Sequence, residues 1–92
     1  MKLDFNKQLV DLDGKTIDNT NLGKVLAQQL VQSNKGDALK FWELALKLQK
    51  GEIIDLDTAD QTLIKEFIKS TDTLSNMGKA QLLLVFETTK NQ

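Results

Sequence analysis

The start of the chain alternates between apolar and polar residues, which is typical of a strand with one buried face. Leu3 and Phe5 alternate with polar residues, and Asp13-Gly14 follows as a two-residue turn signal. Glycine is favoured there because it tolerates the positive φ that a type I′ turn demands. The pattern therefore predicts a β-hairpin over residues 3–18, with an unbroken first strand.

Four later segments place apolar residues at the three- and four-residue spacing of amphipathic helices. Short polar residues precede these segments as N-caps, and Gly36 and Gly51 follow the first two as terminators. The predicted helices span residues 20–34, 37–50, 58–69 and 74–87.

A short segment between the second and third helices, residues 52–56, is rich in β-branched residues and predicts a third strand that could extend the hairpin. The expected fold class is α+β, mostly helical, in the order ββααβαα. With 92 residues, 40% of them hydrophobic and 27% charged, the chain has the size and composition of one globular domain over residues 1–92. We expect a flexible tail over residues 88–92.

The residue types that the chain lacks exclude more classes of function than the residue types present indicate. The chain has no Cys and no His, and all of its twelve basic residues are Lys. It therefore lacks thiol nucleophiles, the commonest general base and the commonest metal ligand. We expect no enzyme, no catalytic residue, no cofactor and no metal. A formal net charge of −1 and the absence of Arg also argue against nucleic-acid binding.

The location of the protein is inferred from two further features. Residues 1–10 contain no apolar core of a secretory signal, and the longest apolar run, residues 82–86, is far shorter than the ~20 residues of a membrane span. We therefore expect no membrane partner and a cytoplasmic protein.

Two pairs of carboxylates, Asp11 with Asp13 and Asp55 with Asp57, are the nearest approach to a chemical motif. Paired carboxylates can bind divalent cations, but the spacing around Gly14 does not fit a calcium loop. Asp13 at the start of a turn and Asp57 as a helix cap explain two of the four. Any role beyond turns and caps stays open.

Two of the predicted helices, 37–50 and 74–87, carry apolar arcs too wide for one neighbouring element to cover. The core is the favoured place for Phe41, whereas Trp42 fits the core and an interface equally well. The predicted partner interface consists of Trp42, Leu46, Leu83 and Phe86.

Three short motifs resemble a set of small phage and prophage proteins. These are a D-G-K-x-I hairpin (residues 13–17), a G-D-A-L-K helix start (36–40) and an A-Q-L-L helix (80–83). The motifs are structural, so the resemblance assigns no site residue. It implies a virus-encoded product, either a virion or assembly accessory or an inhibitor of a host system.

The leading hypothesis is a non-enzymatic protein-interaction module that self-associates and is encoded by a phage. The alternative is a phage inhibitor or sequestering protein that acts on a host defence or regulatory factor, in which case a small-molecule ligand stays open. A transcription regulator ranks third, because a recognition helix without Arg that carries Phe41 and Trp42 reads the major groove poorly.

Overall fold

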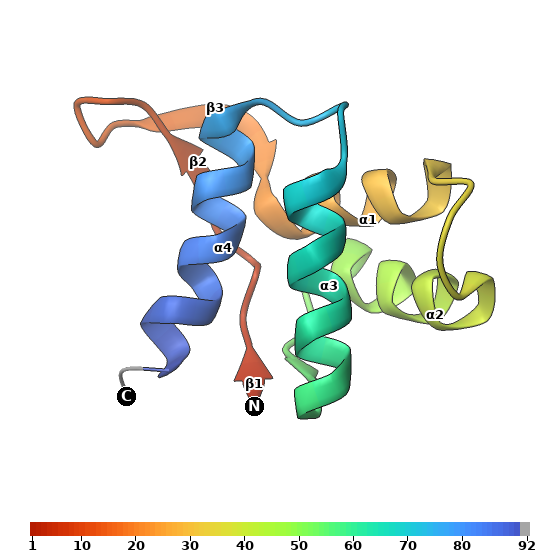
Figure 1. Ribbon diagram of the computed structural model, residues 1–92. Coiled ribbons are helices and arrows are strands. Elements are labelled where there is room, and N and C mark those ends of the chain that lie inside the picture. Colours follow the sequence, from red (N-terminus) through yellow and green to blue (C-terminus); the bar gives the residue numbers. More distant parts are fainter. Residues whose placement is uncertain (91–92) are drawn as a thin grey trace.

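The computed structural model describes residues 1–90, with side chains through Thr88, and shows a mostly helical α+β fold (Figure 1). Within these residues, four helices and four short strands follow one another in the chain. The elements are β1 (Lys2–Leu3), β2 (Gln8–Val10), β3 (Thr16–Asn21), α1 (Leu22–Gln32), α2 (Ala38–Gln49), β4 (Ile54–Asp55), α3 (Thr58–Ser70) and α4 (Asn76–Lys90).

The helices form two antiparallel pairs, α1 with α2 and α3 with α4, and the pairs cross each other steeply (Figure 1). The apolar faces of all four helices meet strands β1 and β4 in one core. No polar or charged residue is buried among the described side chains. The core consists of Leu3, Phe5, Leu22, Leu26, Ala27, Leu30, Phe41, Ala45, Leu48, Ile54, Leu56, Ile64, Ile68, Leu82, Val85 and Phe86.

Helices α2 and α3 begin within one residue of their predicted starts, whereas α1 begins at Leu22 rather than at residue 20, because Asn21 is its N-cap. The side chains of Asn21, Asp37 and Asp57 each accept a hydrogen bond from the backbone N–H three residues later. These bonds satisfy donors that a helix start leaves without an intrahelical partner. Gly51 ends α2 as predicted: its φ is +76°, and its N–H donates to the Leu48 carbonyl at 3.1 Å in a Schellman motif.

The expected unbroken first strand is wrong, because the chain turns between β1 and β2. The Asp4 carboxylate accepts from the backbone N–H of Asn6 at 2.9 Å, and the Lys7 N–H donates to the Phe5 carbonyl at 2.8 Å. Such local bonds replace ladder bonds and bend the strand. As a result β1 pairs with β4 and β2 pairs with β3, so the third strand does not extend the hairpin.

The hairpin turn also differs from the expected two-residue type I′ turn. The Asp11 N–H donates to the Lys15 carbonyl at 2.8 Å, which leaves a three-residue loop. Only Gly14 in that loop has a positive φ, +81°, as in a type I turn followed by a bulge. Asp11 rather than Asp13 starts the turn, because its Oδ1 accepts from the N–H groups of Asp13 and Lys15.

The ends of two helices need correction as well. Gly36 does not terminate α1, because Ser33 is the C-cap and Gly36 lies in the connecting loop. Helix α4 runs to Lys90 rather than to residue 87. Three residues of the expected flexible tail are therefore helical, and residues 91–92 lie outside the described part of the chain. The helix continues past Glu87 because no Gly or Pro follows that residue to end it.

The Gln81 side chain joins the hairpin to α4. Its Oε1 accepts from the Val10 N–H, and its Nε2 donates to the Val10 carbonyl, both at 2.9 Å. The amide therefore takes the place that a neighbouring strand would take along the outer edge of β2. This pairing explains the glutamine of the A-Q-L-L motif in structural terms.

Gly36 and Gly14 allow a matched test of the packing around Phe41. Both have positive φ, but a Cβ on Gly36 would lie 2.5 Å from Phe41 Cε2, whereas a Cβ on Gly14 meets nothing within 4 Å. Gly14→Ala should cost about 1 kcal/mol for the backbone alone. Gly36→Ala should cost about 2–4 kcal/mol, because overpacking adds to that strain. Urea unfolding measures both, and equal losses would contradict the close packing of Phe41 on Gly36.

Candidate functional site

Helices α1 and α2 expose a group of large apolar side chains on their outer side. Three of them, Leu39, Trp42 and Leu46, follow one another at the three- and four-residue spacing of a single helix face, and Val31 joins them from α1. Leu39 is 76% exposed and Trp42 is 56% exposed. We name this set of four residues the α1–α2 face.

A groove of about 250 Å³ lies between the two helices within this face. Its walls are mainly aliphatic and aromatic, and its polar groups are two amides. The lining residues are Ala27, Gln28, Val31, Trp42, Ala45, Leu46 and Gln49. A second hollow of about 370 Å³ lies on the loop side of Trp42 and is lined in part by Val31, Gly36 and Leu39. Trp42 therefore stands between two apolar hollows.

The charges beside the groove are mostly positive at one end. Lys24 lies one turn before Gln28 on α1, and Lys50 lies one turn after Leu46 on α2; both are exposed. The two helices are antiparallel, and a Cβ on Gly23 would lie 3.1 Å from the Leu48 carbonyl, so the two lysines are at the same end of the pair. Glu43 is the acidic residue on the exposed side of α2, and the exposed Glu52 follows Lys50 at the lysine end, where the two lysines leave the charge positive on balance.

The structure divides the predicted interface residues between two places. Trp42 and Leu46 lie on the α1–α2 face. Phe86 is only 1% exposed and packs edge-on against Phe5 with ring centroids 5.7 Å apart, so placing it on a partner surface was wrong. Leu83 is half-buried against the core on α4.

The α1–α2 face includes two residues that the predicted interface lacks, Val31 and Leu39. The signal for Leu39 is present in the sequence, because it is three residues before Trp42 and seven before Leu46. Val31 has no such local signal, since only the packing of α1 against α2 brings it to Trp42.

Other apolar side chains are exposed away from this face. Met77 and Leu84 are exposed on α4, and Ile53 precedes β4. Leu12, at the tip of the β2–β3 hairpin, is fully exposed. It precedes Asp13 and follows Asp11, whose carboxylate holds the turn.

The four carboxylates that the sequence singles out are not brought together. Asp11 holds the turn and Asp57 caps α3, while the Asp55 Oδ1 lies 3.2 Å from the Met1 ammonium. Asp13 is exposed at the hairpin tip. Within residues 1–90 no group of three or more acidic side chains is placed to hold a metal ion.

A wider cleft of about 600 Å³ lies between β3 and the start of α1. Its polar lining is mainly side-chain amides, and several of these serve the fold itself. Asn21 caps α1 and donates to the Asn6 side chain, and Thr20 Oγ1 accepts from the Leu9 N–H at 3.2 Å. Asn19 adopts a left-handed φ of 61° where the β2–β3 register shifts. The cleft is thus a consequence of the bulged hairpin.

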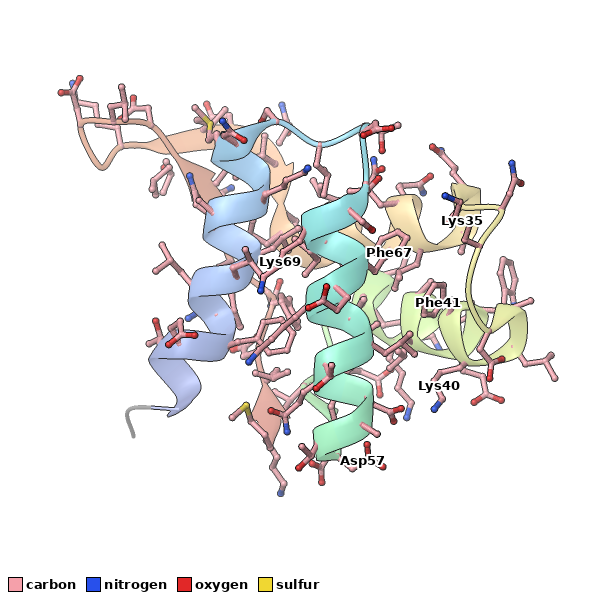
Figure 2. The ribbon with its side chains drawn as sticks, in the orientation of Figure 1. Lys35, Lys40, Phe41, Asp57, Phe67 and Lys69 are labelled. Atoms are coloured by element: carbon pink, nitrogen blue, oxygen red, sulfur yellow. The ribbon has the colours of Figure 1, made fainter. Side chains whose placement is uncertain are left out.

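Lys40 forms an ion pair that joins α2 to α3. Its Nζ lies 2.5 Å from Asp60 Oδ1, below the edge-on pair of Phe41 and Phe67 (Figure 2). The hydrogen bond to Asp60, together with the negative charge of that carboxylate, raises the pKa of Lys40 above 10.5. Lys40 is therefore a protonated partner of Asp60 at neutral pH rather than a nucleophile.

Comparison with protein-family models, with curated proteins and with solved structures gives no match for this chain. Within residues 1–90, none of the helices has the length and apolar character needed to cross a membrane.

Titration of Lys40 tests the α2–α3 ion pair. Its ε-methylene resonances should report a pKa above 10.5, and Asp60→Asn should lower that pKa towards the ordinary value. Because the folded pKa is raised, the stabilisation is complete below pH 10.5 and is lost as the pH rises through the folded pKa. The same Lys40 pKa in both proteins would show that Asp60 does not hold it.

Proposed function

We propose that this protein is a non-enzymatic protein-interaction module that self-associates through the α1–α2 face. The observation that carries the proposal is the contiguous exposure of Val31, Leu39, Trp42 and Leu46 over one side of a helix pair. Apolar side chains exposed singly are ordinary, whereas a gathered group that includes a groove is typical of a binding surface. Tryptophan in particular is enriched at the centres of protein interfaces.

Burial of the α1–α2 face favours association. Fully burying one large apolar side chain contributes about 1.5–3 kcal/mol. The four residues of the face are already partly covered, with exposed fractions from 39% for Val31 to 76% for Leu39, so each adds roughly two-fifths to three-quarters of that range. Together they supply several kcal/mol, which offsets part of the cost of bringing two chains together.

The surroundings of the charged groups support binding rather than catalysis. The interior of the described chain contains no polar side chain, and Lys40 is held in its charged form by Asp60. Perturbed acids and bases in a cleft are the usual mark of an active site. The α1–α2 groove instead presents apolar walls with two amides at its edge.

The viral origin that the resemblance implies stays a prediction. If the protein is phage-encoded, a self-associating module of this size fits an accessory of virion assembly. Helix α2 is also poorly suited to recognise DNA bases, because its exposed side carries Leu39, Trp42 and Leu46. This disfavours the hypothesis of a transcription regulator.

A pair of matched substitutions tests the proposed function. Leu46→Glu places a charge in the groove, whereas Leu84→Glu places one on an exposed side of α4 that is distant from the α1–α2 face in the chain. We expect the unchanged protein to form larger species as its concentration rises. Leu46→Glu should weaken this association at least tenfold, and Leu84→Glu should leave it unchanged, as measured by sedimentation equilibrium.

Both substituted residues are exposed, so circular dichroism should show an intact helical fold in each variant. A protein that stays monomeric at millimolar concentration would overturn the proposal. So would an association that Leu84→Glu abolishes and Leu46→Glu does not.

A further inference from the structure

The hairpin tip presents a single apolar side chain in a fixed position. Leu12 is fully exposed, so nothing in its own chain covers it. The turn that carries it is held by four bonds, all made by Asp11. Its N–H donates to the Lys15 carbonyl and its carbonyl accepts from the Gly14 N–H, at 2.8 and 3.0 Å, while its carboxylate accepts from the N–H groups of Asp13 and Lys15. An exposed leucine on an ordered turn can dock without a large loss of chain entropy.

The hairpin as a whole is also fixed to the body of the molecule. The Gln81 amide makes two hydrogen bonds with the backbone of Val10, close to the turn. Thr20 Oγ1 further joins the strands by accepting from the Leu9 N–H of β2, and it donates to the Ile17 carbonyl within β3. The hairpin is therefore a projection bonded to α4 and across its own strands.

The α1–α2 groove fits this projection in size and polarity. A cavity of roughly 150 Å³ holds a benzene ring, so a groove of about 250 Å³ admits the isobutyl group of leucine. Asp11 and Asp13 on either side of Leu12 carry two negative charges, which outweigh the single positive charge of Lys15 at the base of the turn. Lys24 and Lys50 at one end of the groove carry positive charge. The apolar group and the flanking charges are thus complementary on the two surfaces.

The hairpin tip and the groove lie at opposite ends of the molecule (Figure 1). The tip projects on the α4 side, whereas the groove lies on α1 and α2 beyond α3. A chain cannot place its own Leu12 in its own groove. A second copy can, and the contact then joins two different surfaces and repeats from copy to copy as a ring or an open chain.

We propose that the groove of the α1–α2 face receives Leu12 of a second copy of this chain, with Asp11 and Asp13 beside Lys24 and Lys50. This inference rests on the proposed function and specifies its geometry: association is head-to-tail rather than two-fold symmetric. A symmetric contact of α2 with α2 would use the same face and would leave Leu12 outside.

A mixing experiment separates the two geometries. Leu12→Glu removes the tip and keeps the groove, whereas Leu46→Glu blocks the groove and keeps the tip. Each variant alone should be monomeric by sedimentation velocity at a concentration where the unchanged protein associates. An equimolar mixture should form a one-to-one complex with twice the mass of one chain, which cannot grow further because one copy lacks the tip and the other lacks the groove.

Ile53→Glu provides the matched control, because Ile53 is exposed and belongs to neither surface. It should associate like the unchanged protein. If Leu12→Glu associates like the unchanged protein while Leu46→Glu does not, the head-to-tail inference is overturned and the proposed function stands. If the mixture of two monomeric variants stays monomeric, the inference is overturned too. If the unchanged protein never associates, both fall together.

Discussion

Helix α2 buries Phe41, Ala45 and Leu48 in the core and leaves Leu39, Trp42 and Leu46 facing water. These buried side chains determine the position of the helix. Phe41 packs edge-on against Phe67 of α3 with centroids 5.4 Å apart, and its ring fills the space that Gly36 leaves without a Cβ. Because these side chains face the core, no remaining element of the described chain covers Leu39, Trp42 and Leu46.

The core of the described chain is built from one class of side chain. The described interior is wholly apolar, so it supplies packing energy and no reactive group. The charged side chains that do make specific contacts serve the fold, as Lys40 with Asp60 and the capping aspartates show. Among the exposed apolar side chains, Val31, Trp42 and Leu46 lie together around a groove.

Local signals in the sequence were sufficient for the helices and insufficient for the sheet. Caps such as Asn21, Asp37 and Asp57 act through bonds to residues three positions away, so short-range pattern predicts them correctly. The partner of β1 is more than fifty residues distant, and the bend after Asp4 depends on one side-chain bond. Tertiary packing decides which strands pair, and the alternation of apolar and polar residues along one strand does not specify its partner.

The same distinction applies to the candidate site. The apolar arc of α2 predicted that some of its large side chains stay uncovered, and the structure leaves Trp42 and Leu46 exposed, although the sequence alone placed Trp42 equally well in the core. Phe86 was misplaced because α4 is apolar nearly all round, so periodicity does not say which side meets Phe5. Val31 was missed because its own helix gives no sign of the Trp42 side chain beside it.

The central claim is that another copy of this protein covers the α1–α2 face. Trp42 reports on it directly, since it is the only tryptophan in the chain and is 56% exposed in the monomer. Acrylamide should quench its fluorescence readily in dilute protein, and quenching should fall, with a blue shift of the emission, as the protein concentration rises. Emission and quenching that stay those of an exposed indole at every concentration would contradict the claim.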